Sequence, residues 1–227
     1  MGGASRWWLH HTLTRLGEAI EARGGRLILR RGDAAGRIPD LVDEIGAGAV
    51  YWNRRYEPAV IARDQRLKAH LKAAGVVVQS FNGSLLFDPL EVRNKQGTPF
   101  KVFTPFWRHC LDREVAEPLG GGPRAWPSPA TWPASDALAD WGLLPTIPWD
   151  ADFAGRWSPG EAGAKAALKR FVGEAMAAYA DQRNRPAIAG TSRLSPFLHF
   201  GEISPRQIWA AVRAAGAERG VFPPNGG

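Results

Sequence analysis

The sequence is poor in cysteine, methionine and tyrosine, with one, two and three of them among 227 residues. A single cysteine, Cys110, excludes an internal disulfide and any cysteine-cluster metal site. Cys110 lies in an apolar helical pattern, so we expect a buried small residue and a reducing compartment, the cytoplasm. No apolar run is long enough to cross a bilayer, and the start, Met1 to His11, lacks the cleavage site of a signal peptide.

Several enzyme motifs are missing as well. No G-x-G-x-x-G follows an expected strand, and the segment 160–165 (GEAGAK) lacks the spacing of a P-loop. The five histidines show no ligand spacing for zinc, because His10 and His11 are adjacent and the other three are scattered. There is no nucleophile elbow. We therefore expect no bound metal and no hydrolase of these classes.

Positive charge, in contrast, is abundant. The formal net charge is +7, from 29 lysines and arginines against 22 acidic residues. This excess favours an anionic partner, with nucleic acid as the first candidate. A GC-rich genome, which encodes arginine freely, would give the same excess without such a partner.

Apolar periodicity predicts alternating helices and short buried strands in the first part of the chain. Helices are expected over 4–25, 35–47 and 57–75, and strands over 26–33, 49–56 and 76–81. Strands separated by helices need crossover connections, so the sheet should be parallel and covered by helices. Such a sheet begins with a strand, whereas this chain opens on a helix. We therefore expect an N-terminal strand to lie outside this sequence.

Proline, glycine and tryptophan dominate from about 117 to 159. Proline fixes φ and removes hydrogen-bond donors, which prevents long regular elements, but the segment is too aromatic for free disorder. We interpret it as a connector whose tryptophans anchor it to the surfaces it crosses. An aromatic binding platform is the alternative.

Helical signals return after the connector. A capping-box spacing at Ser158–Glu161 predicts the start of a helix over 162–183, and a second box at Ser204–Gln207 predicts another helix. Leu168, Phe171, Val172, Ala175 and Tyr179 are expected to share one face of the first. Roughly sixty helical residues are few for an independent domain, so we expect its C-terminal part to lie outside this sequence. The expected domains are 1–116, 117–157 and 158–227.

The segment 190–209, GTSRLSPFLHFGEISPRQIW, has the chemistry of an anion site. Gly190 permits a tight turn, Thr191 and Ser192 offer hydroxyls, and Arg193 supplies a planar charge that can fork onto phosphate. Backbone amides at a helix start add donors. For the serines at 195 and 204, helix capping is the simpler interpretation.

This segment resembles the flavin-phosphate signature of the DNA photolyase/cryptochrome family. Three further stretches agree in order and spacing: GGASRWWLHHTL at 2–13, VYWNRRYEP at 50–58 and KVFTPFWRHC at 101–110. The likeness is greatest to bacterial class I cyclobutane pyrimidine dimer photolyases. It implies an α/β fold, with an incomplete Rossmann-like photolyase domain on a parallel sheet. The start of an all-α FAD-binding domain would follow.

The resemblance also implies site residues and partners. FAD would be bound by Tyr179, Thr191, Ser192, Arg193, Leu194 and Ser195, and DNA would be contacted by Arg183. No catalytic residue matches within this sequence. The implied partner is damaged DNA containing pyrimidine dimers, with no membrane and a monomeric protein. A second, antenna chromophore is common in the family. Pro58, Ala59 and Val60 stand where a folate site would have polar contacts, so folate is not supported, and a deazaflavin or no antenna remains open.

The implied function is light-dependent DNA repair, in which photoexcited reduced FAD donates an electron that splits the cyclobutane ring. As a fragment, the chain alone is expected to be inactive. One alternative is a cryptochrome-type flavin photoreceptor without repair activity. Another is a non-catalytic nucleotide- or nucleic-acid-binding remnant.

Overall fold

The computed structural model describes residues 1–126 and 128–219. The chain divides into two compact units. Unit 1 joins Met1–Phe81 to Gly121–Gly160, and unit 2 joins Asn82–Gly120 to Glu161–Gly227. Within the described ranges, no helix has the length and apolar content needed to span a membrane.

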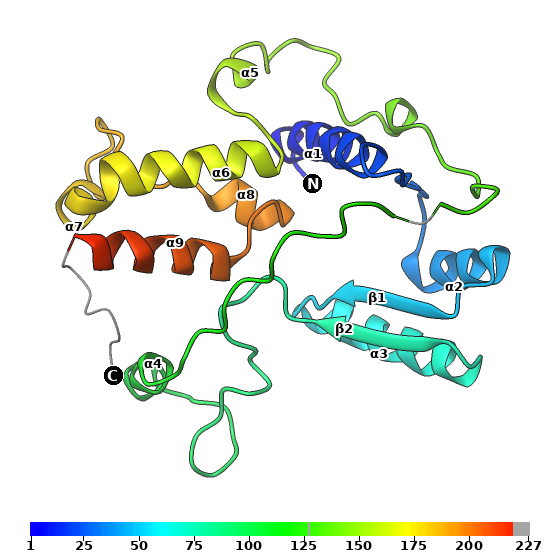
Figure 1. Ribbon diagram of the computed structural model, residues 1–227, viewed down its shortest axis with the longest axis horizontal. Helices are drawn as coiled ribbons and strands as arrows, with labels where there is room; N and C mark the ends of the chain where they lie inside the picture. The colour runs from blue at the N-terminus through cyan, green and yellow to red at the C-terminus, as the bar shows by residue number, and fades with distance from the viewer. Residues whose placement is uncertain (127, 220–227) are drawn as a thin grey trace. The chain divides into compact units, whose positions relative to one another are not determined.

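Unit 1 is built on two parallel strands. β1 (Ala49–Asn53) pairs with β2 (Val77–Phe81), with Ala49 opposite Val77. The connection between them is α3 (Pro58–Ala73), which covers the sheet beside α2 (Ala34–Ile45), as Figure 1 shows. Apolar side chains of α2, of α3 and of the residue before β2 form one buried cluster, composed of Val42, Leu67, Leu71 and Val76. The alternating helices and parallel strands confirm the α/β prediction.

The first of the three expected strands, 26–33, is not a strand in the structure. The backbone of 29–31 bonds instead to the connector. The Leu29 amide donates to Ser135 Oγ (2.9 Å), the Asp136 amide donates to the Leu29 carbonyl (2.7 Å), and the Arg31 amide donates to Asp136 Oδ2 (2.7 Å). Two of these acceptors are side-chain oxygens, so the extended segment satisfies its amides without forming a ladder.

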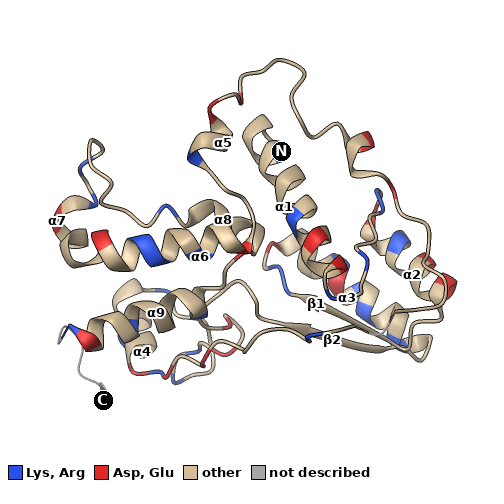
Figure 2. Cartoon of the chain, turned by 45° about the horizontal axis from the view of Figure 1, so that its top comes forward, with Lys and Arg blue, Asp and Glu red and all other residues tan. Residues whose placement is uncertain are grey.

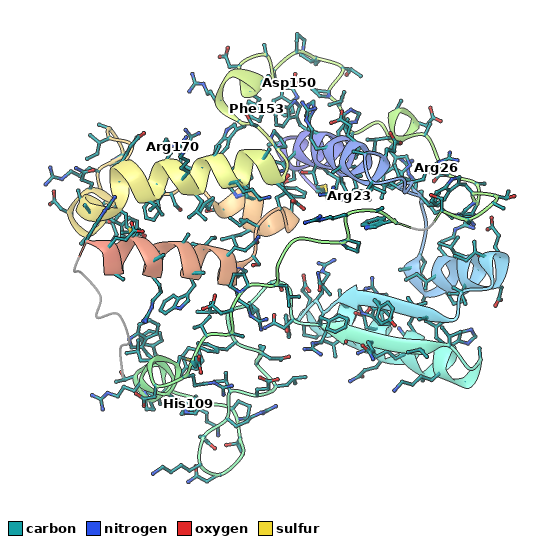
Figure 3. All side chains as sticks on the ribbon, in the orientation of Figure 1. Arg23, Arg26, His109, Asp150, Phe153 and Arg170 are labelled. Atoms are coloured by element: carbon teal, nitrogen blue, oxygen red, sulfur yellow. The ribbon has the colours of Figure 1, made fainter. Side chains whose placement is uncertain are left out.

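Within unit 1, aromatic contacts hold the connector to the N-terminal helix. The connector packs on α1 (Gly3–Glu21), whose Trp7 and Trp8 are 3% and 5% exposed. Phe153, at the start of α5 (Phe153–Arg156), meets Trp7 edge-on at 5.3 Å between ring centroids, and Trp157 meets Trp8 at 5.4 Å. Figure 3 labels Phe153 on this turn. Of the connector tryptophans, Trp157 makes the kind of anchoring contact that was expected.

Unit 2 is mainly helical. Its described helices include α4 (Phe103–Leu111), α6 (Glu161–Arg170), α7 (Tyr179–Gln182), α8 (Ser195–Phe200) and α9 (Pro205–Glu218). α9 has the predicted capping box. Its Ser204 Oγ accepts the Gln207 amide at 3.2 Å, and the Gln207 side chain accepts the Ser204 amide at 2.8 Å. Cys110 on α4 is buried, as expected, and burial raises the pKa of its thiol.

The helix expected after Ser158–Glu161 is present, but Gly160 and not Ser158 directly precedes its first residue. α6 starts at Glu161, after Gly160 in a left-handed conformation with φ +107°. Charges of both signs lie side by side on α1, α2 and α6 (Figure 2). These three helices therefore present no uniformly positive face, and the case for a nucleic-acid partner rests on particular residues.

Candidate cofactor-binding site

The candidate site lies entirely in unit 2, where an irregular helical run leads to Tyr179. After α6 the chain makes a π-helical turn, η2 (Phe171–Ala175), and a 3₁₀ turn, η3 (Met176–Ala178), before α7. π turns free a backbone carbonyl from the regular ladder. Here the Val172 carbonyl accepts a hydrogen bond from the guanidinium of Arg219 at 2.8 Å. The wide π turn and the tight 3₁₀ turn change the direction in which the following residues point.

Tyr179 keeps only part of the burial expected from a regular helix. Leu168, Phe171 and Ala175 are buried, whereas Tyr179 is 39% exposed. Its ring meets the edge of Phe171 at 5.6 Å and 86°, which fixes one side of the phenol. The guanidinium of Arg183 lies 5.8 Å from the centre of the same ring. This cation–π geometry places the two predicted site residues next to each other.

The chain returns to α7 at Gly190, which is buried. A Cβ at this position would lie 2.6 Å from the Cβ of Gln182 and 2.8 Å from the Gln182 carbonyl oxygen. Only a residue without a side chain can come this close. Gly190 therefore holds the loop that follows against the turn that carries Tyr179 and Arg183.

The loop 191–194 has one strained position. Arg193 has φ +54° and is the one non-glycine residue with positive φ in the described part of the chain. The Leu194 amide donates weakly to Ser192 Oγ at 3.4 Å. Leu194 is 2% exposed and Phe197 is 3% exposed, so the far end of the loop is anchored in the core of unit 2. Thr191 and Arg193 remain exposed.

Ser195 begins α8, a helix of only six residues. Its hydroxyl is not a helix cap, because the N-cap position is Leu194 and no side-chain bond is made there. Pro196 has no backbone N–H, so α8 supplies fewer amides than the sequence suggested. If the loop binds an anion as predicted, the side chains that can contact it are the hydroxyls of 191, 192 and 195 and the guanidinium of Arg193.

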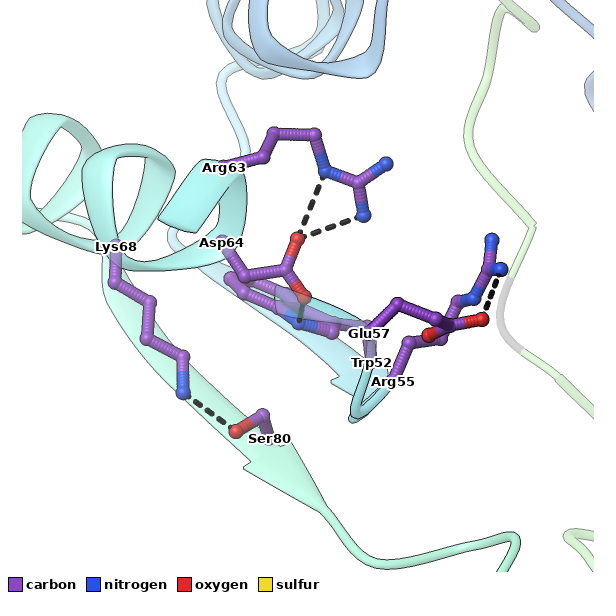
Figure 4. Close-up of polar contacts among 7 residues, drawn as sticks. All are labelled: Trp52, Arg55, Glu57, Arg63, Asp64, Lys68 and Ser80. Atoms are coloured by element: carbon purple, nitrogen blue, oxygen red, sulfur yellow. Dashed lines mark hydrogen bonds and ion pairs between the residues drawn. The ribbon is translucent and has the colours of Figure 1, made fainter. Parts of the chain in front are cut away.

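The carboxyl end of the parallel sheet in unit 1 carries a separate polar cluster (Figure 4). Asp64, 8% exposed, accepts from Trp52 Nε1 at 3.1 Å and from the Arg63 guanidinium at 2.7 and 2.9 Å. Lys68 Nζ donates to Ser80 Oγ at 2.6 Å. Arg55 is paired with Glu57 at 2.5 Å, and this hydrogen bond lowers the pKa of the Glu57 carboxyl. These polar groups therefore form hydrogen bonds and ion pairs with one another.

The neighbouring start of α3 offers little to a second chromophore. Pro58 and Ala59 are exposed there and carry no polar side-chain atom. The identity of an antenna, or its absence, stays a prediction. Within residues 1–126 and 128–219, no cluster of three or more histidine, cysteine, aspartate or glutamate side chains is arranged to hold a metal.

Comparison with known proteins identifies the family. The family model of DNA photolyase matches residues 1–127, so the chain belongs to the DNA photolyase family. It is 44% identical, over 94% of its length, to a deoxyribodipyrimidine photo-lyase of Agrobacterium fabrum, and 34% identical, over 93%, to cryptochrome-1 of Arabidopsis thaliana. It covers 45% of the first relative and 31% of the second.

Among solved structures, a bacterial class III photolyase from Agrobacterium tumefaciens superposes with a TM-score of 0.90 at 43% identity. The match covers 98% of this chain and 46% of that one. The sequence resemblance pointed to class I, whereas this neighbour is described as class III. We therefore assign the family and not the class. The family-model match ends before Tyr179 and the 191–195 loop, so the roles of these residues remain predictions.

Two features of the site escape sequence reasoning. The π turn has no recognisable motif, and the packing of Tyr179 on Phe171 depends on it. Gly190 was expected to permit a tight turn, but the structure shows a close approach to Gln182 with no positive φ.

Proposed function

We propose that this chain provides the first part of the FAD site and a DNA-contacting arginine in a light-dependent DNA repair flavoprotein. The reaction would be splitting of cyclobutane pyrimidine dimers by an electron from photoexcited reduced FAD. The observation that best supports this role is the 191–195 loop. At one end of the loop Gly190 lies against Gln182, and at the other end Leu194 is buried. Between these two fixed points Thr191 and Arg193 are exposed.

The loop residues suit a pyrophosphate. Hydroxyls of Thr191 and Ser192 donate hydrogen bonds to phosphate oxygens, and Arg193 contributes a full positive charge. The partly exposed Tyr179, braced by Phe171, offers a ring face and a hydroxyl on the neighbouring turn. Bound FAD supplies the electron-transfer chemistry. This chain's residues hold and orient it, and fixed loop ends reduce the entropy lost on binding.

Arg183 would contact DNA. It is exposed, and its guanidinium lies over the Tyr179 ring. A guanidinium in this state can take a backbone phosphate, which sets affinity and register without reading sequence. Cofactor and DNA contacts would thus lie on one turn of unit 2.

A chimaera tests the proposal, because the chain spans less than half of the two Agrobacterium photolyases described above. This chain replaces the matching 214-residue segment in the Agrobacterium fabrum photo-lyase. We expect a folded protein that retains flavin and removes pyrimidine dimers in light, but not in the dark. A folded chimaera without flavin, as judged by visible absorbance, would contradict the cofactor role. The isolated chain is the control, with no light-dependent dimer loss expected.

A photoreceptor of the cryptochrome type is the second candidate, favoured by the 34% identity to the Arabidopsis cryptochrome over nearly the whole chain. The same chimaera separates the two. Flavin that is bound and photoreduced without dimer loss would favour the photoreceptor, whereas dimer loss would favour the repair enzyme.

A further inference from the structure

A pocket of about 320 Å³ opens on the surface of unit 1. Three arginines at 30, 31 and 37, together with Glu44 on α2, form one part of its lining. Connector residues 134–136 form the other part. All of these groups belong to unit 1, whereas the flavin-phosphate loop proposed above belongs to unit 2. The proposed FAD-phosphate loop therefore does not account for the arginines of this pocket.

The two carboxylates of the lining are already engaged. Glu44 Oε2 pairs with the guanidinium of Arg30 at 2.6 Å, and Arg30 also donates to the Ala134 carbonyl at 3.2 Å. Asp136 Oδ2 accepts the backbone amide of Arg31 at 2.7 Å. The charge of Arg30 is thus balanced by Glu44, and the remaining cations of the lining are Arg31 and Arg37.

Contacts with neighbouring groups hold these two guanidiniums in place, and the three arginines of the lining face two carboxylates, Glu44 and Asp136, which leaves one positive charge in excess. Arg31 lies over the ring of Trp141 at 5.4 Å. Arg37 Nε donates to the Arg31 carbonyl at 3.2 Å. The Arg37 side chain lies across Gly32, where a Cβ would stand 2.8 Å from Arg37 Nε, and Gly32 has φ +140°. The carboxylate paired with Arg37, that of Asp40, is 3.8 Å away, beyond hydrogen-bond distance.

We propose that this pocket binds a phosphate dianion, either free or as the terminal group of a small phosphomonoester. Two arginines fixed beside one cavity present several planar N–H donors to tetrahedral oxygens. Because stacking on Trp141 and the bond to the Arg31 carbonyl already restrict these side chains, less rotamer entropy is lost on binding. The volume is at the low end of small-molecule sites, roughly 300–1,000 Å³, and leaves room beyond the phosphate for a ribose.

Titration of the 227-residue chain with inorganic phosphate, adenosine 5′-monophosphate and adenosine, at constant ionic strength, tests the proposal. Calorimetry and ³¹P line broadening report binding. We expect both phosphates to bind and adenosine not to bind. Equal affinities would identify the free anion as the ligand, and about tenfold tighter binding of the monophosphate would identify the phosphomonoester. Absence of binding by either phosphate at millimolar concentration would overturn the proposal.

Variants localise the binding. R31Q/R37Q is expected to weaken it about tenfold or more. R66Q removes an exposed arginine on α3 that does not line the pocket, so it should bind as the unmodified chain does. Equal binding by R31Q/R37Q and the unmodified chain, or an equal loss in R66Q, would refute the pocket as the site.

E44Q provides a test that does not depend on the folding of the double variant. It releases Arg30 from its only carboxylate among the pocket residues without changing side-chain size, so a third guanidinium becomes available. We expect phosphate to bind several-fold more tightly. Unchanged or weaker binding by a folded E44Q chain would count against a phosphate site.

Discussion

Gly190 approaches Gln182 so closely that a Cβ on Gly190 would stand 2.6 Å from the Cβ of Gln182. This contact joins two stretches that the sequence treats separately, the end of α7 and the 191–195 loop. Tyr179 and Arg183 belong to the first stretch, and Arg193 belongs to the second. The spacing between Tyr179, a predicted FAD contact, and the predicted phosphate contacts therefore depends on Gly190, which is not itself a predicted contact.

Gly190→Ala should separate the two stretches. The added methyl group meets backbone atoms as well as the Gln182 side chain, so the chain must shift, at a cost of about 1–3 kcal/mol in stability. We expect a lower melting temperature in the isolated chain and a reduced flavin content in the chimaera. Gly173→Ala is the matched control, because a Cβ at 173 meets nothing within 4 Å. If Gly190→Ala retained full flavin and stability, the close approach would not be important for the site.

Arg193 combines a strained backbone with a charged side chain, and two substitutions separate these properties. Arg193→Ala removes the charge and keeps a side chain at φ +54°, so flavin binding should weaken by about 1.5–3 kcal/mol with little change in stability. Arg193→Gly loses the same charge but relieves the left-handed strain, and should raise stability by about 1 kcal/mol. Flavin stoichiometry and thermal unfolding are the measurements. Unaltered flavin binding in both variants would remove Arg193 from the site.

The regular elements of unit 1 were predictable because their patterns are local. Apolar spacing located α1, α2, α3, β1 and β2 to within a few residues, and the crossover rule gave the parallel pairing. The segment 26–33 has the same apolar character as a strand. Whether such a segment becomes a strand depends on the backbone beside it, and here the neighbour is the connector at 134–136, about a hundred residues away.

A sequence motif identified the predicted site residues, but it did not predict how they are arranged in space. Helical periodicity placed Tyr179 on the buried face with Phe171, whereas the π turn between them leaves Tyr179 at the surface. No residue pattern predicts a π turn, and the contacts that accompany it here are tertiary: Arg219 donates to the Val172 carbonyl, and α9 packs on the turn. The glycine at position 190 indicated a special backbone position, but nothing in the residue pattern indicated its close contact with Gln182.

Arg183→Ala tests the DNA contact. Loss of one phosphate contact should weaken binding of duplexes uniformly across sequences, and should reduce the slope of log affinity against log salt by about one. Arg185→Ala is the control, because Arg185 is paired with Asp181 at 2.8 Å and has no predicted DNA role. The measurement is fluorescence anisotropy of the chimaera with dimer-containing DNA at several salt concentrations. An identical slope for Arg183→Ala and the unmodified chimaera would argue against a phosphate role.

Acidification should destabilise unit 1 through His11. Its imidazole packs on Trp7 at 4.4 Å between ring centroids, and burial lowers its pKa from 6.5, aided by the charges of His10 and Arg15 and opposed by Asp150. Because the folded chain binds the proton less readily than the unfolded chain, this contribution to stability is complete above pH 6.5. It is lost as pH falls through the lowered pKa.

His11→Phe keeps an aromatic ring on Trp7 and removes the titrating group, so the free energy of unfolding should fall less between pH 8 and about pH 5 than in the unmodified chain. Asp150→Asn should do the opposite, since removing the opposing carboxylate lowers the His11 pKa further and enlarges the loss at acid pH. Urea unfolding monitored by tryptophan fluorescence at each pH measures both. Parallel pH profiles for all three chains would show that His11 is equally easy to protonate in the folded and unfolded states.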